Sequence, residues 1–273
     1  MSAQGIRLST SAKADTSHEL VTRIDRLPVD SMNNDIARGK VPSAYPYVSF
    51  GQRQFLTSAS DAVIWSDGEF SGPIIGGAQL SVVSTSGEDS SAGTGIRTAE
   101  LHYLDTNLAE KIEIVTLNGT APVLTQAADI YFVNVFHVVT FGSLKKAAGA
   151  ISASYGGFNH ANIRAGDNVQ FSSVRMIPAG KVFYLAGAVA GSASSNSASR
   201  VTVKLASNLY NGLTFTNPFL LLPHGLVDLQ DNTVTFNFPV ASAYHAGSVI
   251  ALIATVDKAC QVSGSLYGWM EDA

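Results

Sequence analysis

The feature that most constrains this 273-residue chain is a succession of short segments in which apolar and polar side chains alternate between turn residues. In residues 99–104 such an alternation runs up to the polar break Asp105-Thr106-Asn107, and residues 111–117 repeat it before Asn118-Gly119. A period of two is typical of a strand with one buried face, and Asn-Gly favours a tight turn because both turn positions take positive φ. We therefore predict two strands and a tight turn here.

The same pattern continues from Tyr45 to the end of the chain, and no long segment shows the 3.6-residue period of a helix. Predicted strands follow one another at roughly 8–15-residue spacing, which is typical of a β-sandwich or jelly roll. The prediction is an all-β fold in which residues 45–155 and 156–273 are either two halves of one sandwich or two small β domains. The further predicted strands are Val48–Phe55, Ala62–Trp65, Gln79–Ser84, Asp129–Phe141, Ala150–Tyr155, Val169–Met176, Lys181–Val189, Arg200–Ala206, Thr214–Leu222, Thr233–Val240, Val249–Val256 and Gln261–Trp269.

Residues 1–44 differ from the rest because they are polar and poor in aromatic side chains, with Pro28 and Pro42 interrupting them. A short helix is predicted over His18–Leu27, with Ser17 as its N-cap. Such a segment cannot build a core alone, so we predict an extended arm that is either ordered against a neighbouring subunit or a disordered tail. The apolar side chains that would attach this arm to a neighbouring subunit are Leu20, Ile24, Leu27, Val29, Met32 and Ile36.

The composition limits the partners of the chain. Charged residues make up 14%, against about 25% in an average soluble domain, which fits a surface that is partly covered in an assembly; we expect a homo-oligomer, with a trimer favoured. The net charge of −4 argues against nucleic-acid binding, since no basic stripe is present to neutralise phosphates. The longest apolar runs, residues 218–222 and 249–256, are too short to cross a bilayer, and the N-terminal residues hold no apolar signal segment. We therefore expect no membrane partner.

No catalytic motif is found in the sequence. Gly-x-Ser-x-Gly, His-Glu-x-x-His and paired-cysteine spacings are all missing, the six histidines are dispersed, and Cys260 is the single cysteine. The expectation is a protein that is not an enzyme, with no cofactor and no metal site. One exception stays open: residues 86–95 and 105–110 each place carboxylates in a loop that could hold Ca²⁺ weakly.

Residues 91–123 resemble a segment that recurs in structural proteins of tailed bacteriophages. Its parts are the strand Gly93-Thr94-Gly95-Ile96-Arg97, the turn Leu104-Asp105-Thr106-Asn107 and the strand and turn of residues 115–123, VTLNGTAPV. Residues 128–142 and 176–188 fit the strands that follow in those proteins. The resemblance covers residues 45–273 in order and leaves out the first 44.

This resemblance implies a structural component of a bacteriophage virion, assembled in the cytoplasm of the host bacterium. The first hypothesis is a capsid decoration, or cement, protein whose β domain sits on the head and whose arm runs along the major capsid protein. The alternative is a tail fibre, a fibre adaptor or a receptor-binding module that contacts host glycans. A depolymerising enzyme is a third alternative, which no set of carboxylates or nucleophiles in the sequence supports.

Overall fold

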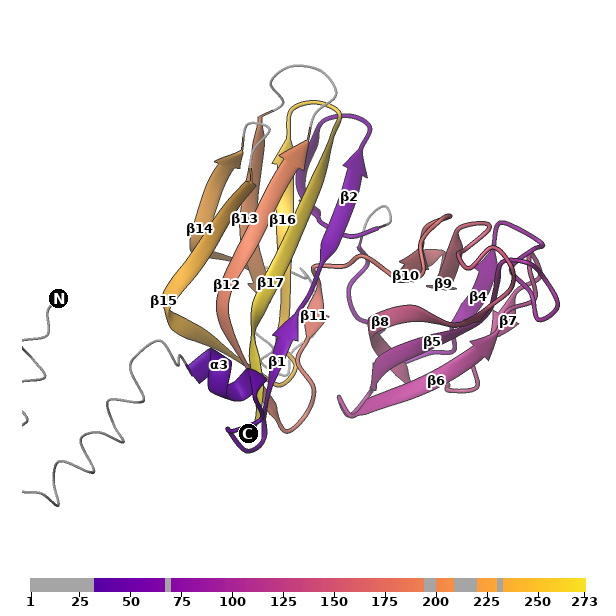
Figure 1. The fold of residues 1–273 in the computed structure, drawn as a ribbon, viewed down its shortest axis with the longest axis horizontal. Coiled ribbons are helices and arrows are strands. Elements are labelled where there is room, and N and C mark those ends of the chain that lie inside the picture. Colours follow the sequence, from indigo (N-terminus) through magenta and orange to yellow (C-terminus); the bar gives the residue numbers. More distant parts are fainter. Residues whose placement is uncertain (1–31, 67–69, 194–199, 209–219, 230–232) are drawn as a thin grey trace, which may run out of the picture. The chain divides into compact units, whose positions relative to one another are not determined.

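A computed structural model describes residues 32–66, 70–193, 200–208, 220–229 and 233–273 (Figure 1). The chain divides into two compact units, residues 1–46 and 47–273. Within the described ranges almost all regular structure is β-strand, which confirms the all-β prediction; the one helix there is α3 (Met32–Ala37). None of the helical structure in these ranges is long and apolar enough to span a membrane.

The first unit is described from residue 32 onward. Met32 and Ile36 of the predicted arm lie in α3, where Ile36 is buried. After the helix, Gly39 takes a φ of 68° and its N–H donates to the Ile36 carbonyl at 2.9 Å, which ends the helix with a left-handed glycine. Strand β1 (Ala44–Val48) then crosses into the second unit. The remaining arm residues Leu20, Ile24, Leu27 and Val29, and the predicted helix His18–Leu27, lie outside the described residues, so the role of the arm stays a prediction.

The described strands of the second unit are β2 (Gly51–Phe55), β3 (Ala59–Val63), β4 (Ser81–Ser84), β5 (Ile96–Asp105), β6 (Glu110–Thr116), β7 (Val123–Leu124), β8 (Ile130–Phe141), β9 (Ile151–Tyr155), β10 (Phe158–Ile163), β11 (Arg175–Met176), β12 (Lys181–Ala193), β13 (Val201–Asn208), β14 (Leu220–Leu229), β15 (Thr233–His245), β16 (Val249–Val256) and β17 (Cys260–Asp272).

Two of the sheets join strands from both ends of this unit. In one, β12 lies between β15 and β17, and β2 pairs with β17; in the other, β16 pairs with β3, β11 and β13, and β13 also pairs with β14. Alternating side chains from both sheets form a common core that includes Phe183, Leu185, Leu252, Leu266 and Met270. Burial of apolar surface between the sheets therefore holds strands that are far apart in sequence.

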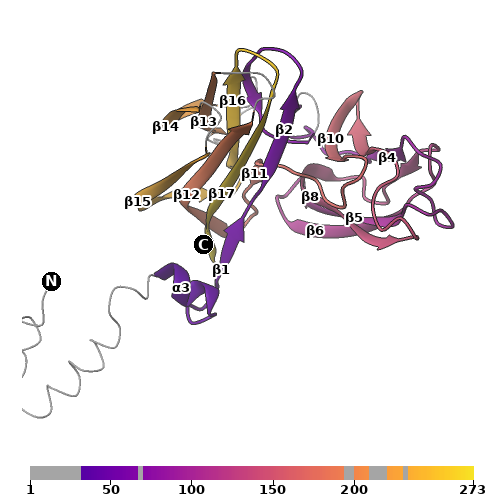
Figure 2. The same cartoon turned by 45° about the horizontal axis from the view of Figure 1, so that its top comes forward.

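The two remaining sheets are built from one continuous part of the chain, strands β4 to β10 (Figure 2). Their orders are β10-β9-β4-β7 and β6-β5-β8, and they have their own core around Leu80, Ile96, Leu101, Ile130 and Phe136. A third cluster, which includes Trp65, Phe132 and Met176, brings side chains of both sets of strands together. The predicted division between residues 155 and 156 falls within the β9–β10 hairpin; as a domain boundary it stays a prediction, as does a jelly-roll or sandwich class.

The two predicted strands pair as the β5–β6 hairpin, and Gly119 takes the positive φ of the predicted tight turn. A hairpin closed by Asn118-Gly119, which this dipeptide also favours, is wrong, because β6 pairs with β5 whereas β7 pairs with β4. Gly119 has a φ of 63°, but its N–H donates to the Asp89 carbonyl and its own carbonyl accepts from the Ser84 N–H, so this turn is held by another loop. Between the predicted strands Ala150–Tyr155 and Val169–Met176 the sequence predicts a polar break at residues 159–168; this prediction is wrong, because most of β10 lies there. Of the predicted strand Val169–Met176 the structure keeps β11 and isolated bridges from Val169 to His137 and from Ser172 to Phe50 and Trp65.

Candidate functional site

The sheet β6-β5-β8 has one buried face and one face with mixed exposure. On β5, Ala99, Leu101 and Tyr103 are buried, so the alternate residues Glu100 and His102 lie on the opposite face. Directly paired residues of an antiparallel sheet share a face. The register places Ile114 and His137 opposite Glu100, and Ile112 and Val135 opposite His102. We call this group of six residues the outer β5 face.

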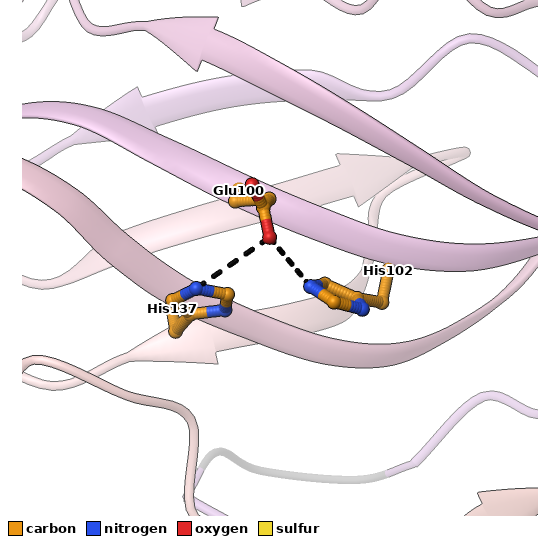
Figure 3. A group of neighbouring side chains, drawn as sticks. All are labelled: Glu100, His102 and His137. Carbon is orange, nitrogen blue, oxygen red and sulfur yellow. Dashed lines mark hydrogen bonds and ion pairs between the residues drawn. The ribbon is translucent and has the colours of Figure 1, made fainter.

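Three side chains of this face form a polar cluster, Glu100, His102 and His137 (Figure 3). The Nε2 atom of His102 lies 2.6 Å from Oε1 of Glu100, and Nε2 of His137 lies 3.6 Å from the same oxygen. The two imidazole rings are tilted by 47°, with centroids 5.3 Å apart. The exposed fractions are 19% for the Glu100 side chain, 38% for His102 and 35% for His137, so solvent reaches the cluster.

The sequence interpretation missed this cluster because it treated the six histidines as dispersed. Glu100 and His102 are separated by one residue, which on a strand puts them on the same face. The sequence alone therefore predicts that Glu100 and His102 share a face. The third member comes from β8, and its place opposite Glu100 depends on the strand pairing, which the sequence pattern does not give.

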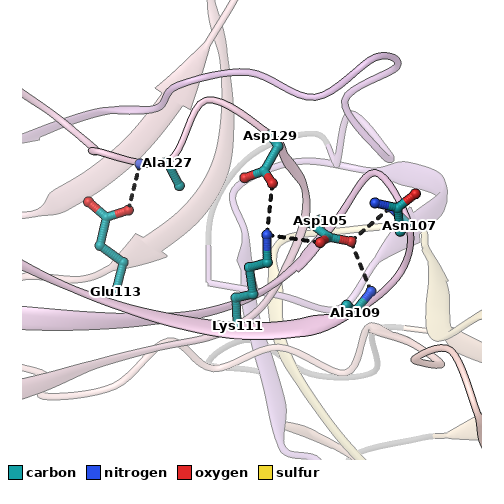
Figure 4. A network of polar contacts seen from close by, with 7 residues as sticks. All are labelled: Asp105, Asn107, Ala109, Lys111, Glu113, Ala127 and Asp129. Atoms are coloured by element: carbon teal, nitrogen blue, oxygen red, sulfur yellow. Dashed lines mark hydrogen bonds and ion pairs between the residues drawn. The ribbon is translucent and has the colours of Figure 1, made fainter.

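A second polar group surrounds Asp105, at the turn between β5 and β6 (Figure 4). Its Oδ1 accepts hydrogen bonds from the backbone N–H groups of Asn107 and Ala109, at 2.8 and 2.9 Å. Lys111 Nζ lies 2.9 Å from Asp105 Oδ2 and 2.9 Å from Asp129 Oδ2. Burial raises the pKa of Asp105, but the hydrogen bonds from Lys111, Ala109 and Asn107 outweigh it, so the pKa is lowered. The bonds to Asp129 and Asp105 raise the pKa of Lys111.

The loop of residues 86–95 also has its carboxylates bound by the protein itself. Asp89 is fully buried and accepts from the Ser84 hydroxyl at 2.6 Å and from the backbone N–H groups of Ile96, Ala148 and Gly149. Hydrogen bonds from the Thr94 hydroxyl and N–H lower the pKa of Glu88. These carboxylates, like Asp105, hold turns in place, so the geometry gives no support to the calcium alternative at either loop.

A third feature is an open depression beside the turn that joins β9 and β10. Tyr155 and Phe158 flank the turn residues Gly156 and Gly157, and their side chains are 50% and 59% exposed. The depression is lined by Gln79, Ser81, Leu124, Ser154, Tyr155, Gly156 and Gly157. Exposed rings beside amide and hydroxyl groups are the kind of surface on which a sugar ring can stack.

Comparison with known proteins does not identify a family for this chain. No protein-family model matches the chain, and no curated protein matches it. Among solved structures, a chain from the structure of infectious bursal disease virus strain Gx is 11% identical, with 84% of this chain and 71% of that chain covered and a TM-score of 0.20. A chain from strain Gt of the same virus is 12% identical, with 84% and 73% covered and a TM-score of 0.18. These scores are too low to show a common fold.

Proposed function

We propose that this chain is a structural component of a virion, and specifically a decoration protein on the head of a tailed bacteriophage. The observation that carries the proposal is the resemblance of residues 91–123 to phage structural proteins. In the structure this stretch forms the β5–β6 hairpin with the turns at Asp105 and Gly119. The residues that resemble the family therefore include four of the six residues of the outer β5 face, Glu100, His102, Ile112 and Ile114. The expected partners are the major capsid protein and further copies of the chain.

The outer β5 face also has the character of a contact surface. Ile112 and Ile114 on β6 are 61% and 55% exposed, and β6 is an edge strand of its sheet. Near the end of β8, Val139 and Phe141 are 41% and 46% exposed. Exposed apolar side chains next to an unpaired strand edge are typical of a surface that another subunit covers.

A reconstruction of the virions tests the location. Particles of the virus that encodes the chain should show density for its sheets on the head shell, at a stoichiometry set by the shell symmetry. Density on the tail alone, or a particle without the chain, would contradict a decoration protein.

An add-back experiment tests the surface. Particles made without the chain are incubated with the purified protein, and the bound fraction is measured after sedimentation. The double variant Ile112→Glu/Ile114→Glu should bind at least about tenfold more weakly, since each charge must be desolvated at the contact. Leu56→Glu is the matched control because Leu56, 82% exposed, lies outside that sheet. Equal binding by the double variant and wild type would show that this face is not the contact.

The depression beside Tyr155 favours a second candidate, a fibre-type or receptor-binding module. In that case Tyr155→Ala should reduce binding to host-surface polysaccharide and leave binding to the particle unchanged. Glycan binding that is unaffected by Tyr155→Ala would count against this candidate.

A further inference from the structure

We propose that Glu100, His102 and His137 bind one zinc ion, or a divalent ion of similar preference. The proposal is independent of the virion role, because it rests on the three side chains alone. It also departs from the expectation, drawn from the dispersed histidines, that the chain binds no metal.

The donor set suits zinc. Two neutral imidazole nitrogens and one carboxylate oxygen are the ligands of many zinc sites in which a fourth position is left to water or to another group. Imidazole favours zinc, copper, nickel and iron over magnesium or calcium. All three potential ligand atoms lie within 4.8 Å of one another.

The separations are close to those that a bound ion requires. In a tetrahedral site with ligand bonds of about 2.0–2.1 Å, the ligand atoms lie about 3.3 Å apart. The observed separations from Glu100 Oε1 are 2.6 Å to His102 and 3.6 Å to His137. An ion therefore has to part Glu100 from His102 and draw His137 inward, which side-chain rotations can provide.

The sheet fixes the positions from which these side chains extend. Glu100 and His102 follow one another on the outer face of β5, and His137 is paired directly with Glu100 on β8. Leu101, between Glu100 and His102, is paired with Phe136, which precedes His137; both are buried on the inner face and anchor the two strands in the core. A site on paired strands is better preorganised than one on a loop, because the backbone does not have to be ordered on binding.

The described residues that pair in register with the three side chains carry no charge. They are Ile112, Ile114, Val135 and Val169. Lys111 is paired with Tyr103, on the inner-face side of the strand, and its ammonium group binds Asp105 and Asp129. With the three side chains 19–38% exposed, water can supply the fourth ligand.

The test is metal binding by the full-length chain, prepared without a histidine tag and stripped with a chelator. Co²⁺ is titrated in while its visible absorption bands are followed, and Zn²⁺ is then added to displace it; bound zinc is counted by mass spectrometry after gel filtration. The expected result is one equivalent of metal. Zinc should also raise the melting temperature, since a ligand that binds the folded state stabilises it.

Three variants and a control decide where the ion binds. His102→Ala, His137→Ala and Glu100→Gln should each weaken zinc binding by at least about tenfold, since even outer-shell changes cost that much. His245→Ala, an exposed histidine at the end of β15, should bind as wild type does. Circular dichroism of each metal-free variant checks its fold; the side chains are partly exposed, so folded variants are expected. The proposal would be overturned if the wild-type protein held no equivalent of zinc at micromolar concentration. It would also be overturned if folded His102→Ala and His137→Ala bound zinc as tightly as wild type does.

Discussion

At the scale of single residues, the buried carboxylate of Asp89 has hydrogen-bond partners on both of its oxygens. Its two carboxylate oxygens accept four hydrogen bonds from residues of three separate segments, which joins the loop of residues 86–95 to the start of β5 and to residues 148–149. A buried carboxylate is retained only where such partners offset the loss of its hydration. Asp89 is therefore a structural residue.

Replacement of Asp89 by alanine should lower the free energy of unfolding by about 3 kcal/mol or more, because the change leaves several buried donors without an acceptor. Urea denaturation monitored by fluorescence measures this loss. Glu88→Ala is the matched control, since Glu88 is exposed and its pKa-lowering partner is the adjacent Thr94. A loss for Asp89→Ala no larger than that for Glu88→Ala would contradict this account.

The lowered pKa of Asp105 predicts a dependence of stability on acid. A carboxyl group with a lower pKa in the folded than in the unfolded chain contributes stability above its unfolded value of about 3.9. That contribution is lost as the pH falls through the folded pKa, because both states are then protonated. In Asp105→Asn the urea midpoint should consequently fall less than in wild type as the pH is lowered from about 5, roughly one unit above the unfolded pKa, into the acid range below that pKa. Parallel curves for the two proteins would show that Asp105 does not contribute.

The Glu100, His102 and His137 cluster shows how far sequence reasoning reaches at this scale. Alternation places Glu100 and His102 on one face, so the sequence pattern is sufficient to identify two of the three residues. His137 required the pairing of β8 with β5 in a particular register, and that register contains irregularities on both sides of the cluster. Long-range pairing is decided by the packing of the inner face, which a local pattern does not contain.

At the scale of elements, strands with one clearly apolar face could be predicted, whereas strands next to polar residues could not. The predicted segments 129–141 and 249–256 correspond closely to β8 (Ile130–Phe141) and β16 (Val249–Val256). β10 was missed because its buried residues include His160 and Asn162, which read as loop residues. The depth at which those polar groups lie is set by tertiary packing rather than by the residues themselves.

Two glycines with similar backbone angles allow a prediction about turns. Gly119 and Gly156 have φ values of 63° and 61°. An added Cβ at Gly156 would meet nothing within 4 Å, whereas at Gly119 it would lie 2.9 Å from the Gly87 Cα. Gly156→Ala should cost about 1 kcal/mol from backbone strain alone, and Gly119→Ala should cost clearly more because the loop at Gly87 must move. Thermal unfolding of both variants measures the difference in stability. Equal losses of stability would show that the loop at Gly87 can move at no cost.

At the scale of the whole molecule, the division into units at residues 46 and 47 bears on the predicted arm. Removal of residues 1–44 should leave the second unit folded, since its cores are formed by residues beyond this segment. Under the proposed function the shortened chain should bind particles more weakly than the full chain. Far-UV circular dichroism checks the fold and sedimentation with particles checks binding. If the shortened chain bound particles as tightly as the full chain, the second unit alone would account for attachment.

The expected trimer belongs to the same scale. The exposed apolar residues of the outer β5 face would be covered in such an assembly. Light scattering of the purified chain at micromolar concentration measures its mass; a monomer that also fails to associate on particles would contradict the expectation.

The pairing of β2 with β17 has a consequence for how the chain is made. A ribosome releases β2 before strands β3 to β16, and its hydrogen-bonding partner β17 (Cys260–Asp272) emerges only after them. Strands β4 to β10 find all their sheet partners within their own stretch of chain, so they can acquire structure while synthesis is still under way. We therefore expect strands β4 to β10, in the middle of the polypeptide, to fold first. Strand β2 can pair only after β17 has been synthesised. A nascent chain stalled just before β17 would expose the edge of β12, which makes chaperone binding most useful at that moment.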